Sequence, residues 1–146
     1  MRVLAVCIGL AQMRQDRGQS YLTAIGKTAV EGPVAVGRLG LASDEQADLS
    51  VQGEISNAVY AYPSEHLPFW QTVRAQAGVA AWGEAIAPGL LGENLLLEGL
   101  RETGLWIGDR LWIGRGDDTA PPCVLAVIEP RMPWARVAAI SSYSQP

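Results

Sequence analysis

The segment Gly32-Pro33-Val34-Ala35-Val36-Gly37-Arg38-Leu39-Gly40-Leu41 shows how this chain is built. Its central residues alternate in the manner of a β-strand, and glycines interrupt it at short intervals. Gly26 adds another glycine shortly before it. Repeated glycines between short strands indicate a sheet that bends sharply, as the sheet of a small barrel must. The segment therefore predicts a mainly β fold that closes into a barrel.

Short apolar runs recur on both sides of this segment. We expect strands over residues 2–10, 59–62, 94–98, 105–113 and 123–128, with a turn or bulge at Gly108-Asp109 inside the fourth run. Residues 12–20 are polar and contain glycine, so they predict a loop. The many short strands are typical of a closed β-barrel.

One stretch has the pattern of a helix, residues 64–77. Its apolar side chains fall on one face at helical spacing: Leu67, Trp70, Val73 and Ala77. Ser64 is placed to cap its start, Glu65 suits the positive end of its dipole, and Gly78 suits its end. The sequence thus predicts a single mainly β domain over residues 1–146 with one or two short helices.

The composition excludes several classes of protein. The chain has 146 residues, is 49% hydrophobic and carries a formal charge of −4, which argues against disorder and against sequence-independent binding of nucleic acid. The apolar residues 1–11 fit a buried first strand better than a signal peptide, because the run is short and charges follow closely. We expect a soluble cytoplasmic protein with no membrane partner and no nucleic-acid partner.

Cysteine and tryptophan need separate interpretation. Cys7 and Cys123 are predicted to be free thiols, with Cys7 in the core. Most of the five tryptophans are predicted to lie in the core or at a barrel rim. Trp134 is predicted to pack or to cover an interface, and stacking on a pterin or purine is the alternative.

Several motifs, taken in order, resemble the MOSC domain, the C-terminal domain of molybdenum cofactor sulfurase and its relatives. They are Thr23-Ala24-Ile25-Gly26-Lys27 with Val30-Glu31-Gly32-Pro33-Val34, the loop at residues 39–48, Ala58-Val59-Tyr60-Ala61-Tyr62-Pro63 with Glu65-His66, Gly92-Glu93-Asn94-Leu95, Ile107-Gly108-Asp109, and Pro130-Arg131-Met132-Pro133. The resemblance covers nearly the whole chain. It implies a closed antiparallel β-barrel similar to the one first described in pyruvate kinase.

The departures from the family pattern cluster on polar site residues. A reactive cysteine usually follows Pro-Arg-x-Pro, and Trp134 stands in that place. The usual His-Gly-Gly-x-Asp-Lys reads Gln52-Gly53-Glu54-Ile55-Ser56-Asn57, and Ser43 stands where glycine is usual. A molybdenum centre or a sulfur transfer needs a soft thiolate, which an indole cannot supply. Cys123 lies eleven positions too early to replace it. The site is therefore expected to be altered or inactive, with no catalytic residue assigned.

The resemblance places cofactor binding on five residues: Arg131, Glu93, Asn94, Asp44 and Lys27. Arg131 lies between two prolines and is expected to bind a phosphate or pterin oxygen, or else to be a surface arginine or the partner of a carboxylate. Glu93 and Asn94 either contact an anionic ligand or shape their own loop. Asp44 and Asp48 either bind a cation or cofactor or satisfy their own turn.

His66 is the only histidine and has two interpretations. It acts as a general base, or it lies at the helix surface or caps the helix, which the sequence favours. A histidine/cysteine zinc site needs more ligands than the chain offers at one place, so no metal site is expected.

The resemblance implies a role with the molybdenum cofactor (molybdopterin). Relatives act as sulfur carriers or reduce N-hydroxylated compounds, and pyridoxal phosphate binding is a further association. The alternative is a noncatalytic or oligomerising β-barrel that binds an anionic ligand or a protein partner, including another copy of itself. The missing cysteine favours the alternative, and the fold favours the cofactor role.

Overall fold

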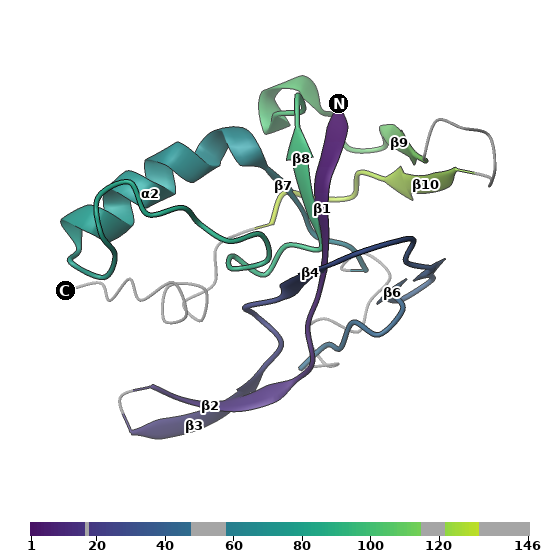
Figure 1. Cartoon of the computed structure of the whole chain (residues 1–146). Coiled ribbons are helices and arrows are strands. Elements are labelled where there is room, and N and C mark those ends of the chain that lie inside the picture. The colour runs from purple at the N-terminus through teal and green to yellow at the C-terminus, as the bar shows by residue number, and fades with distance from the viewer. Residues whose placement is uncertain (17, 48–57, 115–121, 132–146) are drawn as a thin grey trace.

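The computed structural model describes residues 1–16, 18–47, 58–114 and 122–131 (Figure 1). A four-stranded sheet forms its centre, in the order β4 (Thr28–Val30), β1 (Arg2–Ile8), β8 (Leu95–Glu98) and β7 (Ala61–Pro63). Three two-stranded sheets, one α-helix and two short 3-10 helices complete the described elements of the chain. The prediction of a mainly β fold with one clear helix is confirmed.

The central position of β8 follows from its sequence. Leu95, Leu96 and Leu97 are all buried, which is typical of a strand that is covered on both faces. β8 pairs antiparallel with β1 and parallel with β7, so the sheet is mixed and not wholly antiparallel as predicted. A parallel pair needs a long crossover, and the helical segment and the connector that follows it supply one.

The predicted helix is present as η2 (Ser64–His66) followed by α2 (Leu67–Gln76). Ser64 does not cap it, because Pro63 and His66 take the N-cap positions and neither makes a side-chain cap. Glu65 instead accepts a hydrogen bond from the Gly99 N–H, which ties the helix start to the end of β8. Gly78 has φ +70° and ends the helix as predicted.

Two predictions for the strands were wrong in part. Residues 12–20, predicted to be a loop, form most of the hairpin of β2 (Gln12–Asp16) and β3 (Gln19–Thr23). The strand predicted within residues 32–41 is reduced to the small hairpin of β5 (Val36–Gly37) and β6 (Gly40–Leu41). Glycines at the bends explain the short strands, since Gly40 has φ +134°.

The last hairpin joins β9 (Arg110–Ile113) to β10 (Cys123–Ala126). Residues 105–107, predicted to belong to the same strand as β9, instead follow η3 (Glu102–Gly104) into a turn. The Asp109 carboxylate closes that turn by accepting a hydrogen bond from the Trp106 N–H at 2.9 Å. An aspartate that bonds nearby backbone favours a turn over a continued strand.

The buried apolar residues come mainly from the central sheet and the connector after α2, with one each from β6 and α2: Cys7, Leu41, Ala75, Ile86, Leu91 and Leu95–Leu97. The core position of Cys7 is confirmed. Of the two positions predicted for the tryptophans, the core is wrong for Trp82, Trp106 and Trp112, which are all largely exposed. Trp70 is half-buried and donates a hydrogen bond to the Tyr62 hydroxyl at 2.6 Å.

Some predictions fall outside the described residues: those for Asp48, Gln52–Asn57 and Trp134. No helix in the described part of the chain is long and apolar enough to cross a membrane.

Candidate functional site

The acidic loop after β6 is shaped by a left-handed residue. Ser43 has φ +66°, the region that favours glycine, which explains the usual glycine in the motif that this loop resembles. The Asp44 N–H donates to the Leu41 carbonyl at 3.1 Å and closes a tight turn. The turn points the Asp44 carboxylate inward, where its side chain is only 6% exposed.

Asp44 joins three segments that are far apart in sequence. Its oxygens accept hydrogen bonds from the Gly9 N–H at 2.8 Å and from the Asn94 amide at 2.9 Å. Both oxygens also lie 2.5 Å from the Lys27 amine, whose side chain is 8% exposed. We call Lys27, Asp44 and Asn94 the polar junction. Asp44 therefore satisfies distant partners and not only its own turn.

Lys27 enters the junction from the segment between β3 and β4. Burial lowers the pKa of its amine, the hydrogen bond and charge of Asp44 act in the opposite direction, and Arg131 lowers it further. The net pKa lies below the usual value of a lysine. The Lys27 amine thus forms a buried ion pair with a single carboxylate, that of Asp44.

Asn94 completes the junction through both ends of its amide. Its NH₂ group donates to the Cys7 carbonyl at 3.2 Å as well as to Asp44, and its oxygen accepts from the Tyr60 N–H at 3.1 Å. The backbone of Asn94 pairs with the same two neighbours. The side chain of Asn94 therefore adds a second set of hydrogen bonds to Cys7 of β1 and to Tyr60 just before β7, beside those that its backbone already makes.

Glu93 is fully buried and turns away from this arrangement. Its carboxylate accepts hydrogen bonds from the backbone N–H groups of Gly89 at 2.6 Å and Leu91 at 3.1 Å. Burial raises the pKa of Glu93 above its usual value, and these backbone N–H groups partly offset that effect. Gly89 permits the fold of this loop, because a Cβ there would lie 2.3 Å from the Lys27 carbonyl. The anion held by these backbone amides is thus the protein's own carboxylate.

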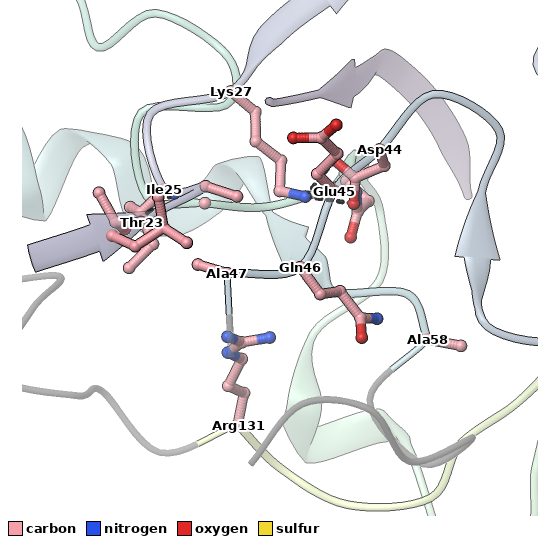
Figure 2. Close-up of a pocket in the computed structure, with 13 residues that line it drawn as sticks. Thr23, Ile25, Lys27, Asp44, Glu45, Gln46, Ala47, Ala58 and Arg131 are labelled. Carbon is pink, nitrogen blue, oxygen red and sulfur yellow. Dashed lines mark hydrogen bonds and ion pairs between the residues drawn. The ribbon is translucent and has the colours of Figure 1, made fainter. Parts of the chain in front are cut away.

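Arg131 reaches the same region from the other side (Figure 2). Its guanidinium carbon lies 4.7 Å from the centroid of the Tyr60 ring, a cation–π contact. No carboxylate among the described residues lies within ion-pair distance of it. Its cationic group is therefore oriented by an aromatic face and is not neutralised by any carboxylate of the described residues.

A small cavity of about 60 Å³ lies between Arg131 and the polar junction. Four of the five predicted binding residues line it: Lys27, Asp44, Asn94 and Arg131. Glu93 does not. Thr23, Ile25 and Gln46 also line it, and Tyr60 lies behind Arg131. These four residues belong to the motifs quoted above but were not assigned to the site, because their side chains carry no charge that would mark them as ligands of an anion. A second cavity of about 320 Å³ shares the Thr23 and Ile25 walls, and Arg14 is its charged lining residue.

Neither thiol belongs to the cavity. Cys7 is fully buried, and burial together with the charges of Glu93 and Asp44 raises the pKa of its thiol to about 11, against the opposing charge of Lys27. Cys123 lies on β10 and is half-buried. The described residues also contain no cluster of three or more histidine, cysteine or acidic side chains placed to hold a metal ion.

His66 lies away from the cavity, at the start of α2. Its Nε2 atom is 2.9 Å from a Glu102 oxygen, and its ring contacts Tyr62 edge to face at 5.9 Å. The interpretation as a helix-surface residue fits this position.

Comparison with known proteins gives a consistent answer. The model of the MOSC domain matches residues 48–140. The uncharacterized protein YflK of Bacillus subtilis (strain 168) is 32% identical over 136 residues, which cover 93% of this chain and 55% of YflK. The protein YiiM of Escherichia coli (strain K12) is 32% identical over 111 residues, covering 76% of this chain and 44% of YiiM.

A solved structure agrees with the sequence comparisons. The crystal structure of YiiM from Geobacillus stearothermophilus superposes with a TM-score of 0.62 at 26% identity, over 97% of this chain and 57% of that one. This chain therefore spans about half the length of the relatives it matches. The MOSC model alone matches well over half of the chain, so this protein belongs to the MOSC domain family.

Proposed function

We propose that this MOSC domain binds an anionic ligand of the molybdopterin type through Arg131, and that it does so without the thiolate chemistry usual in its family. The observation that carries the proposal is the guanidinium of Arg131. It lines a cavity, rests on the Tyr60 ring and has no carboxylate partner among the described residues. A planar guanidinium held in this way suits the two-oxygen recognition of a phosphate.

The size of the cavity limits what enters it. About 60 Å³ accommodates a group of phosphate size, whereas sites that enclose a whole drug-sized ligand measure roughly 300–1,000 Å³. The ligand would therefore insert one anionic end, and the rest of it would lie outside. Lys27 contributes positive potential from the cavity wall, although Asp44 holds its amine.

The residues at the cavity fit the anionic part of the molybdenum cofactor but not its metal. Molybdenum favours a thiolate ligand from the protein, and neither Cys7 nor Cys123 lines the cavity. We therefore assign no sulfur-carrier or reductase step to this site. Pyridoxal phosphate fits less well than a pterin phosphate, since reaction with a lysine amine would have to take Lys27 from Asp44.

Closure of the sheets into the barrel of the family is part of the same proposal. The short strands and the left-handed backbone at Gly26, Gly32 and Gly40 support it, because sharp bends bring separate sheets together.

The test is the molybdenum and pterin content of the protein made in a host with an active cofactor pathway. Arg131→Gln removes the charge at the cavity, and Arg101→Gln is the matched control, because Arg101 is exposed and does not line it. We expect bound pterin in the wild type and in the control, and at least tenfold less in Arg131→Gln, which corresponds to about 1.4 kcal/mol of binding.

The outcomes separate the alternatives. Pterin without molybdenum supports the proposal. Stoichiometric molybdenum would contradict the proposal that the site no longer binds the metal, and a reductase assay should follow. Absence of pterin from the wild type, or equal pterin in the wild type and Arg131→Gln, would contradict a site at Arg131.

A further inference from the structure

The hairpin of β9 and β10 has two faces of different character. The register pairs Trp112 with Val124 and Arg110 with Ala126, and side chains of paired residues share one face. All four are exposed, whereas the residues of the opposite face, Leu111, Ile113, Cys123 and Leu125, are half-buried. Hydrogen bonds between Val127 and both Gly108 and Asp109 continue the ladder, which places the exposed Ile128 on the outer face.

This outer face is unusually apolar for a surface. We call Arg110, Trp112, Val124, Ala126 and Ile128 the hairpin face. Trp112 is 64% exposed, Ile128 46% and Val124 43%, and in the turn just before β9 Trp106 and Ile107 are exposed as well. Single exposed apolar residues are ordinary, but several on one face of a hairpin mark an interaction surface.

We propose that the hairpin face binds the same face of a second copy of this chain, in a two-fold symmetric dimer. The face is chemically self-complementary. It presents an arginine beside a tryptophan, so a two-fold axis lets Arg110 of each copy stack on Trp112 of the other. The five residues of the face include no lysine and no acidic residue, and tryptophan and arginine are the residues enriched at the centres of interfaces.

The exposed area suits a weak, concentration-dependent contact. From the usual areas of these side chains, the five residues of the hairpin face expose about 450 Å² in each copy. Two copies would then bury about 900 Å², which is in the range of weak, transient associations. Each strand also has an outer edge that is unpaired among the described residues, so backbone N–H and C=O groups beside the hairpin face are open to a second chain.

The experiment is sedimentation velocity across a concentration series from about 1 to 500 μM, a range that brackets a moderate dimer affinity. The mass of the wild type should rise from 15.6 kDa toward twice that value. Trp112→Ser should shift the midpoint at least tenfold toward higher concentration, and Arg110→Glu should do the same. Trp82→Ser is the matched control, because Trp82 is 72% exposed but lies in the loop after α2.

Three results would overturn the proposal: a wild type that stays monomeric at every concentration, Trp112→Ser and Trp82→Ser with the same effect, or a dimer that survives Arg110→Glu unchanged. In the first case the face would serve a different partner. Circular dichroism of each variant guards against unfolding as the cause, and exposed positions on a hairpin should leave the spectrum unchanged.

Discussion

The polar junction and the hairpin face reverse the usual distribution of side chains. The junction places a lysine, an aspartate and an asparagine inside the protein, where each has hydrogen-bond partners. The hairpin face places tryptophan, valine and isoleucine outside, where roughly half of each residue is exposed. Partnered polar groups in the interior support the fold, whereas unpartnered apolar groups on the surface contribute little to it. Substitutions in the polar junction should therefore lower the free energy of unfolding strongly, whereas substitutions on the hairpin face should change it little.

Asp44→Ala should have the largest effect on stability. It leaves the buried Lys27 amine without its partner and removes an acceptor from Gly9 and Asn94. Breaking a buried pair in this way costs about 3–5 kcal/mol. Urea unfolding followed by circular dichroism measures the loss, and a change below about 1 kcal/mol would contradict a buried ion pair.

A double variant sharpens this result. Lys27→Met with Asp44→Asn removes both charges, and replacing a whole buried pair is far less costly than breaking it. We expect the double variant to be more stable than Asp44→Ala. The losses caused by Lys27→Met and by Asp44→Asn alone should therefore not add up to the loss in the double variant.

Glu93→Gln should have the next largest effect. Both Glu93 oxygens accept backbone N–H groups, and an amide keeps only one acceptor, so one donor is left unsatisfied at a cost of about 1–3 kcal/mol. The cost should depend on pH. The pKa of Glu93 is raised in the folded state, so its contribution to stability is fully present below the unfolded pKa, about 4.3, and declines as pH rises through the folded value.

The advantage of the wild type over Glu93→Gln should therefore be larger near pH 4 than near pH 7, since other carboxylates are common to both proteins and cancel. Urea unfolding of both proteins at the two pH values measures it. If the stability advantage of the wild type over Glu93→Gln grew with pH, the pKa of Glu93 would have to be lowered in the folded protein, contrary to this prediction.

Ser43→Gly should raise stability modestly. Ser43 holds a left-handed conformation that costs a non-glycine residue roughly 1 kcal/mol, and glycine adopts it freely. Thermal unfolding should show a higher midpoint. Ala42→Gly, at a neighbouring exposed position without a positive φ, is the control and should lower stability through chain entropy.

Trp112→Ser should have the smallest effect when the protein is dilute. The side chain is exposed, so the free energy of unfolding of the monomer should change by less than about 0.5 kcal/mol. Unfolding in urea at low micromolar concentration tests this, and a loss comparable to that in Asp44→Ala would mean that Trp112 packs within its own chain.

The sequence predicted the elements that the core covers. The apolar runs around β1 and β8 and the spacing of Leu67, Trp70 and Val73 carry information about burial, and burial decides these elements. The hairpin of β2 and β3 was missed because its strands are mostly polar and project from the body of the protein (Figure 1). The exposed tryptophans were misjudged because hydrophobicity alone does not reveal which faces the fold leaves uncovered.

The site was predicted in part, through motifs and not through geometry. Lys27, Asp44, Asn94 and Arg131 do share one cavity. Their contacts span separations of 17 and 50 residues, which no local pattern encodes. Local sequence also gave no sign that the backbone amides beside Glu93 would hold its own carboxylate.

Because Cys7 is buried, chemical modification of its thiol would report when the protein opens. Its thiol is inaccessible and largely protonated at neutral pH, so an alkylating reagent can reach it only when the central sheet separates. Cys123, half-buried on the outer hairpin, should be modified earlier. The difference between the labelling rates of Cys123 and Cys7 would measure how much more slowly the central sheet opens than the hairpin of β9 and β10.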